Sequence, residues 1–277
     1  MSDDKLVKRQ GNFSRALRGE EPLVIGEVLQ RAWEITVRSL PVMLPLMIAY
    51  IVIAMVLNSL FLTIPEGMTM FDVMLDPELK SDNDWTGIVT QIILAPLWGG
   101  LTLIGILNAN DEKITFSAAF SVLQRSIPVM AVTFVKLALP ALITFLAFVS
   151  IGLFSPPAAG AVSLIALIII NITFMLAIPL VVHRQTSVFK SIMGSVLVLR
   201  RYFWRALGLM IIMVIIIIIS ALPLLLGLLF TLPLLFNVTG VLYIALLGDR
   251  DTQEAEPVFA EEQVEASSPI NKDTPNE

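Results

Sequence analysis

The stretch "ALGLMIIMVIIIIISALPLLLGLLFTLPLLFNVTGVLYIALL", Ala206–Leu247, runs for 42 residues without an acidic or basic side chain. An α-helix rises about 1.5 Å per residue, so roughly 20 apolar residues cross the ~30 Å hydrocarbon core of a bilayer. Because the stretch is about twice that length, it must fold back on itself. It therefore predicts a membrane hairpin with spans at about 206–224 and 229–247.

Four further apolar stretches of 22 to 25 residues precede this hairpin, and none of them contains an Asp or a Glu. They are Pro41–Leu62, Thr86–Asn108, Pro128–Ile151 and Ala158–Val182. Charged residues make up 15% of the 277 residues, against about 25% in a typical soluble domain. Together these observations predict an all-α polytopic membrane protein with six transmembrane helices, in a membrane domain that covers 23–247.

The basic residues are distributed unevenly between the two sides of these spans. Sixteen of the 18 Lys and Arg residues lie in the N-terminal region, in 109–127, in 183–205 or in the C-terminal tail. The opposite side carries only Lys80, and Lys136 lies inside a span. Since short cytoplasmic loops carry the excess of Lys and Arg in membrane proteins, we expect both termini to be cytoplasmic.

Three polar segments lie outside the predicted spans. We expect residues 1–22 to form a flexible cytoplasmic N-terminus. Residues 248–277 contain nine acidic and two basic residues and few large apolar ones, a composition typical of an acidic disordered tail. Loop 63–85 contains six acidic residues and one Lys, and we expect it to be a solvated acidic loop.

The spans are predicted to form a threefold repeat. The units have little sequence identity, but their hydrophobic patterns are more clearly similar. The units begin at "LVIGEVLQRAWEITVRSLP" (23–41), "ITFSAAFSVLQRSIPVM" (114–130) and "SVFKSIMGSVLVLRRYFW" (187–204). Each start has the apolar periodicity of an amphipathic helix and leads into a membrane hairpin. We therefore expect three hairpin repeats with amphipathic helices on the cytoplasmic side. These helices either cover the bundle or lie at the headgroup level and dock lipid or a protein partner.

Lys136 is the one charged residue inside the predicted spans. A charge at mid-membrane costs about 2.5–3.5 kcal/mol on insertion scales, and such residues mark functional sites more often than others. The side chain has two structural alternatives, because a lysine can snorkel toward the headgroups or make a structural hydrogen bond. The functional interpretation is contact with an anion or a lipid head group.

The amide side chains are the remaining polar groups of the spans. An amide in hydrocarbon needs a partner, and hydrogen bonds between helices are the usual solution. The alternative is a polar pathway through the membrane. The amides are Asn58, Gln91, Asn108, Asn171 and Asn237. We single out Asn171 and Asn237, with Lys136, as candidate intramembrane polar site residues.

The sequence contains no pattern of residues that predicts catalysis or metal binding. It has no cysteine and a single histidine, His183, without a Cys or carboxylate neighbour in sequence. Phosphate-binding loops, hydrolase nucleophile elbows and zinc-protease motifs are all absent. We therefore expect no catalytic, cofactor-binding or metal-binding residues, and no cofactor. Spans without carboxylates also argue against transport coupled to protons or cations through side-chain acids.

Residues 176–210, "LAIPLVVHRQTSVFKSIMGSVLVLRRYFWRALGLM", combine a proline near a span end, an S-x-x-x-S helix and a basic, aromatic entry to the next span. The residues concerned are Pro179, Ser191, Ser195, Arg200, Arg201 and Trp204. This pattern resembles the YciC-like family of bacterial inner-membrane proteins, as does the segment "GGLTLIGILNA" (99–109). More distantly, the chain resembles the membrane domain of glycerophosphodiester phosphodiesterases, whose activity does not carry over without their catalytic domain. The resemblance implies a bacterial inner-membrane location and supplies no site residues.

These observations favour a non-enzymatic protein that supports envelope organisation through partners in the membrane. The expected partners are membrane lipids, with other inner-membrane proteins as a second class, and not nucleic acid. One alternative is a small transporter or channel with a site at the repeat interface, which requires the candidate polar residues to meet in a polar cavity. The other is a membrane-embedded enzyme of lipid metabolism.

Overall fold

The computed structural model describes residues 12–61, 85–152, 154–222 and 227–248. Within these ranges every regular element is helical, and six helices are long and apolar enough to cross a membrane. The prediction of an all-α multi-pass membrane protein is therefore confirmed. The predictions for loop 63–85, for the acidic tail and for residues 1–11 of the N-terminus lie outside the described residues.

The first two spans are α2 (Ile25–Phe61) and α4 (Trp85–Ala109), and the short helix α1 (Phe13–Arg18) precedes them. The amphipathic segment predicted before the first span is the beginning of α2 and continues into the span without a break. Pro41 and Pro45 lie inside this helix. Asn12, the residue before α1, caps the first turn with its side chain, which accepts a hydrogen bond from the Ser14 amide at 2.8 Å.

The third and fourth spans are less regular. A short helix α5 (Phe116–Ser121) and a 3₁₀ turn η2 (Val122–Arg125) lead into α6 (Ser126–Ala147), which ends in the π-helical turn η3 (Phe148–Gly152). The fourth span is broken into α7 (Pro156–Thr173) and α8 (Ala177–His183). The fifth and sixth spans are the long helix α9 (Val188–Ala221) and α10 (Leu228–Leu247).

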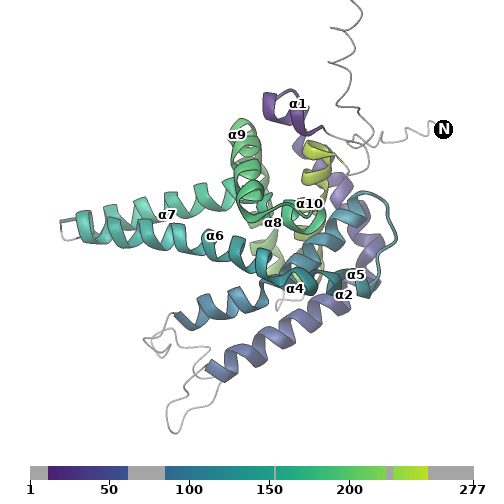
Figure 1. The fold of residues 1–277 in the computed structure, drawn as a ribbon, viewed down its shortest axis with the longest axis horizontal. Helices are drawn as coiled ribbons and strands as arrows, with labels where there is room; N and C mark the ends of the chain where they lie inside the picture. The colour runs from purple at the N-terminus through teal and green to yellow at the C-terminus, as the bar shows by residue number, and fades with distance from the viewer. Residues whose placement is uncertain (1–11, 62–84, 153, 223–226, 249–277) are drawn as a thin grey trace, which may run out of the picture.

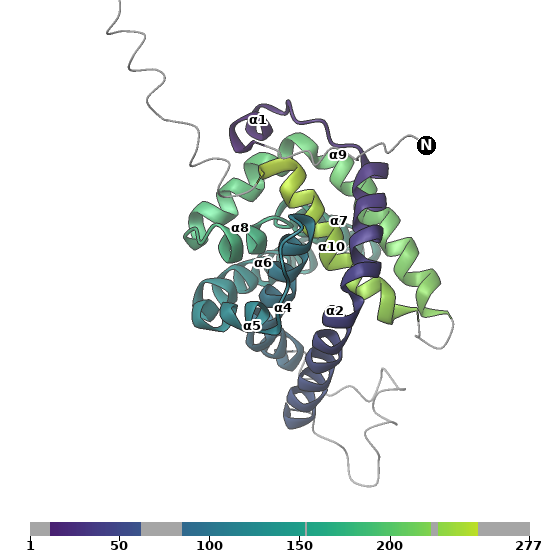
Figure 2. The ribbon, with the colours of Figure 1, turned by 90° about the vertical axis from the view of Figure 1, so that its right-hand side faces the viewer.

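At the centre of the molecule α2, α4 and α10 pack against one another (Figure 2), and buried side chains of α8 and α9 complete the core. Of the 18 consecutive residues of α4 that are the most apolar, 67% are buried. The corresponding share in the span that contains α6 is 11%. Two glycines bring α4 and α10 into backbone contact. A Cβ on Gly240 would lie 2.1 Å from the carbonyl oxygen of Gly105, so no larger residue fits at this crossing.

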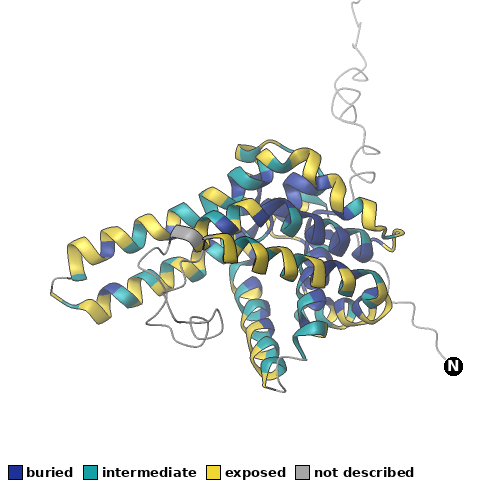
Figure 3. Cartoon of the chain, turned by 90° about the horizontal axis from the view of Figure 1, so that it is seen from below, coloured by how far each residue is buried: buried dark blue, intermediate teal, exposed yellow. Residues whose placement is uncertain are grey.

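The outer parts of the spans diverge from this core. In Figure 1, α6 and α7 run side by side to the left, while the end of α2 and the start of α4 point to the lower left. Figure 3 shows exposed residues along these arms and buried residues where the helices meet. The exposed side chains are large and apolar, among them Leu142, Phe145 and Phe148. Lipid chains would cover such surfaces in a membrane. The threefold repeat remains a prediction.

Candidate functional site

The candidate functional site is a cavity of about 390 Å³ where α4 and α6 meet α2, α7 and α8. Its size falls within the range of ligand sites, roughly 300–1,000 Å³. Six side chains with polar groups line it, and they come from four helices: Tyr50, Gln91, Trp98, Thr133, Lys136 and Asn171. Two of the three candidate residues from the sequence, Lys136 and Asn171, therefore share one cavity.

Lys136 lies about ten residues, or ~15 Å, into α6. Its side chain is half-buried, and among the described residues it makes no ion pair or hydrogen bond. Among the described residues, no Asp or Glu lines the cavity. A cation in an apolar interior is expensive unless it is paired. The charged form of Lys136 therefore has no balancing carboxylate in the described part of the cavity wall.

The other polar groups of the cavity have spare hydrogen-bonding capacity. The Thr133 hydroxyl, one turn before Lys136 on α6, is buried and has no hydrogen-bond partner in the described part of the chain. The Asn171 side chain donates one hydrogen bond, at 2.9 Å, to the Leu167 carbonyl of its own helix. Its second N–H and its carbonyl oxygen remain for other partners. The prediction that Asn171 bonds to another helix is wrong.

The break between α7 and α8 lies beside this cavity, since Asn171 and Ile178 both line it. A helix break leaves backbone groups without partners. Ser195 of α9 satisfies two of them, because its buried hydroxyl accepts from the Leu176 amide at 3.2 Å and donates to the Thr173 carbonyl at 2.7 Å. In membrane transporters, broken helices of this kind accompany binding sites.

Asn237, the third candidate, lies elsewhere. It is fully buried in α10, where its carbonyl oxygen accepts from Asn108 of α4 at 3.0 Å. Its amide donates to the Thr36 hydroxyl of α2 at 2.8 Å, with Ser39 and Met43 close by. For Asn108 and Asn237 the prediction of hydrogen bonds between helices is confirmed. Asn237 therefore joins the three core helices and does not line the cavity.

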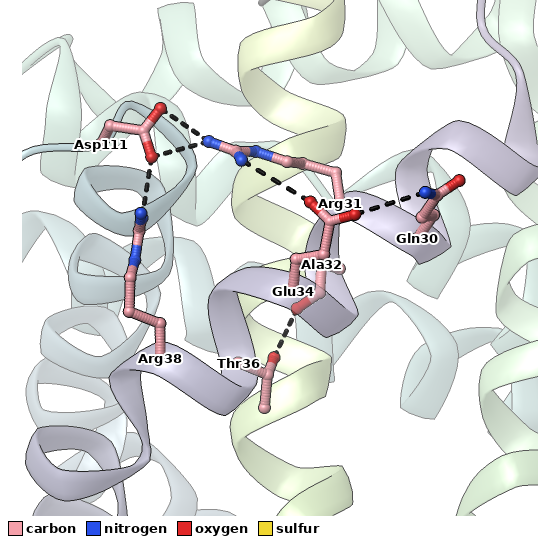
Figure 4. Close-up of polar contacts among 7 residues, drawn as sticks. All are labelled: Gln30, Arg31, Ala32, Glu34, Thr36, Arg38 and Asp111. Carbon is pink, nitrogen blue, oxygen red and sulfur yellow. Dashed lines mark hydrogen bonds and ion pairs between the residues drawn. The ribbon is translucent and has the colours of Figure 1, made fainter. Parts of the chain in front are cut away.

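A second polar cluster fixes the connection after α4. Asp111 accepts from Arg31 at 2.6 and 2.7 Å and from Arg38 at 2.7 Å, as Figure 4 shows. Partial burial raises the pKa of the Asp111 carboxyl, but the hydrogen bonds and charges of Arg38 and Arg31 outweigh it, so the pKa lies below its ordinary value. Asp111 also has a left-handed backbone, with φ at 60°. The cluster is an ion-pair network between α2 and the α4–α5 connection.

His183 has a structural contact. Its ring nitrogen lies 3.1 Å from the Tyr243 hydroxyl, and the two rings meet edge to face. The neighbouring Arg184 donates to the Leu247 carbonyl at the end of α10. Across the described residues, no three His, Cys, Asp or Glu side chains gather in a way that could hold a metal ion.

Sequence reasoning missed part of the cavity. Thr133 is three residues before Lys136, so the two share a helix face, and this spacing was the available signal. Tyr50 and Trp98 face the cavity from α2 and α4. No feature of their local sequence indicates that, because it depends on how the helices pack.

Comparisons with protein-family models, with curated proteins and with solved structures found no match. The chemistry of the cavity is therefore the basis for inferring a function.

Proposed function

We propose that this is a non-enzymatic protein of the bacterial inner membrane, with both termini in the cytoplasm, that supports envelope organisation by binding membrane lipid. The proposal is based on the open cavity at mid-span, which contains a lysine that has no acidic partner within the described ranges. Gln91 and Leu167 belong to its lining and are exposed, so the cavity is not sealed from its surroundings. In a membrane those surroundings are lipid.

The lining is suited to an amphiphile. Beside the polar groups it presents apolar side chains from four helices, namely Ala95, Leu137, Pro140, Leu167 and Ile178. Ligand sites combine a mainly apolar lining with a few placed polar groups. A lipid whose head group meets the polar groups and whose chain follows the apolar ones satisfies both parts.

Purification in native nanodiscs, followed by mass spectrometry of the bound lipids and proteins, tests the proposal. Leu137→Trp adds an indole to the cavity wall, and we expect it to deplete the lipid that co-purifies with the natural protein. The matched control is Leu142→Trp on the same helix, an exposed position that does not line the cavity. Equal lipid content in both variants and in the natural protein would contradict lipid binding at this cavity.

A small transporter is the second candidate, favoured by the break between α7 and α8 beside the cavity. Proteoliposomes loaded with chloride or with inorganic phosphate would distinguish the two. Efflux that depends on the protein and is abolished by Leu137→Trp supports transport. Efflux equal to that of empty liposomes, together with lipid retained in nanodiscs, supports the lipid-binding role.

A further inference from the structure

We propose that the cavity selects a singly charged oxyanion head group, a phosphodiester or a carboxylate, on an apolar tail, and that Lys136 and Thr133 contact the anion. This assignment rests on the proposed lipid binding and adds the chemical class of the ligand.

The charge of the anion follows from the lining. The part of the chain that the structure describes contributes one ammonium to the cavity, that of Lys136, and no carboxylate. In a low-dielectric site an unbalanced charge is costly. One negative charge neutralises the site, whereas a dianion would leave a net charge in the membrane. A phosphodiester or a carboxylate fits this requirement, and a phosphomonoester dianion does not.

The hydrogen-bond donors also suit an oxyanion. The ammonium of Lys136 offers three N–H donors, and the buried Thr133 hydroxyl has no partner of its own among the described residues. The amides of Gln91 and Asn171 add further N–H groups from α4 and α7. A phosphodiester or carboxylate oxygen accepts several such bonds, and those from a charged donor are the strongest.

A zwitterionic choline lipid fits less well. Its quaternary ammonium would need an aromatic face, as in the known cation–π cages. Trp98, the largest ring of the cavity, already packs against Tyr50 at 5.8 Å and against Phe236 at 4.7 Å between centroids. The same ammonium would also be repelled by Lys136. The cavity therefore favours a net anionic lipid over a zwitterionic one.

Trp98 provides a reporter for the test. The chain has four tryptophans, and replacing Trp33, Trp85 and Trp204 by Phe leaves Trp98 as the single fluorophore. Its quenching is then titrated with chain-brominated phosphatidylglycerol and with chain-brominated phosphatidylcholine in detergent. We expect half-maximal quenching at a phosphatidylglycerol concentration about tenfold lower than that of phosphatidylcholine. The reason is that the proposed contact between Lys136 and the anionic head group is charge-assisted.

Three variants in this background separate charge from packing. Lys136→Met keeps the length of the side chain and should abolish the preference for phosphatidylglycerol. Lys136→Arg keeps the charge and should retain the preference. Thr133→Val removes the hydroxyl without changing the shape, and we expect the preference to fall by about threefold. Size-exclusion chromatography confirms that each variant is folded.

Two results would contradict the charge selectivity, and they have different consequences for the proposed function. If both lipids quench equally in the natural background, the charge selectivity is wrong, but lipid binding stands. If neither lipid quenches Trp98, the proposed function fails as well. Inorganic phosphate distinguishes the source of the anion. If millimolar phosphate displaces the brominated lipid, the site recognises a free oxyanion and the apolar tail is not part of recognition.

Discussion

At the scale of single residues, Asp111 lies at the centre of an ion-pair network whose contribution to the free energy of unfolding can be measured. Its side chain is 38% exposed, so solvent weakens the pairs, and we expect Asp111→Asn to cost only about 0.5–1 kcal/mol at neutral pH. Asn tolerates the left-handed backbone as Asp does, so the variant removes charge without adding strain. Thermal unfolding in detergent of the two proteins gives the difference.

The pH dependence of that difference follows from the lowered pKa of Asp111. An unfolded Asp titrates near ~3.9, so the stabilisation is complete above this pH and is lost as the pH falls through the lower folded-state pKa. The two proteins should therefore differ from pH 7 down to about 4 and converge in more acidic solution. A gap that does not change between pH 7 and pH 3 would rule out the carboxylate as its source.

Asn108 and Asn237 form the second residue-scale prediction. Asn237→Leu removes the acceptor of the Asn108 amide and the donor to the Thr36 hydroxyl, which keeps only its bond to the Ala32 carbonyl. We expect about 1–3 kcal/mol of destabilisation. The double variant with Asn108→Leu removes both members of the pair and should be less destabilised than the two single losses added together. The coupling expected within a membrane protein is about 0.6 kcal/mol on average and at most ~1.7. Strict additivity in unfolding experiments would show that the bond contributes nothing.

Asn108 and Asn237 also show how many of the polar contacts could be predicted from the sequence. Each amide was expected to need a partner, and Asn108 and Asn237 meet that expectation, because hydrocarbon offers no water. Which polar residues meet one another depends on the rotation of each helix about its axis, and the nearly uniform apolar spans give no amphipathic signal for it. That is why Asn237 was grouped with Lys136, although the structure buries it in a different place.

At the scale of helices, the crossing of α4 and α10 depends on two glycines. A Cβ on Gly240 would overlap the backbone of Gly105, and backbone cannot move aside as a side chain can. We expect Gly240→Ala to destabilise the protein by about 2–3 kcal/mol or to prevent folding. Gly160→Ala on α7 is the matched control, because nothing lies within 4 Å of its added methyl group. Equal thermal stability of both variants would contradict the close crossing.

The broken fourth span gives the second prediction at this scale. Ser195→Ala removes the hydroxyl that serves both sides of the α7–α8 break, and we expect a loss of about 1–3 kcal/mol, the cost of buried unsatisfied backbone groups. Ser163→Ala is the control, since this hydroxyl only bonds to the Ala159 carbonyl of its own helix. If thermal unfolding shows that the control is equally destabilised, Ser195 has no special role at the break.

At the scale of the whole molecule, the apolar stretches predicted the number and type of long helices, because span length is set by the thickness of the bilayer. The amphipathic segments before the first and fifth spans are continuous with those spans in α2 and α9. The divergence of the arms and the central position of α4 and α10 were not predicted. Both depend on contacts between helices far apart in the chain, which hydropathy does not record.

The orientation of the whole molecule is open to direct measurement, because the chain has no cysteine and a single introduced thiol has no background. Ser81→Cys places a probe in the segment proposed to face outward, and Ser2→Cys and Ser267→Cys place probes near the two ends. In bacterial spheroplasts, an impermeant maleimide should label the first variant at once and the other two only after permeabilisation. This result is expected because 16 of the 18 basic residues lie on the proposed cytoplasmic side. Immediate labelling at either end, with Ser81→Cys protected, would mean that the charge distribution assigns the wrong face to the cytoplasm.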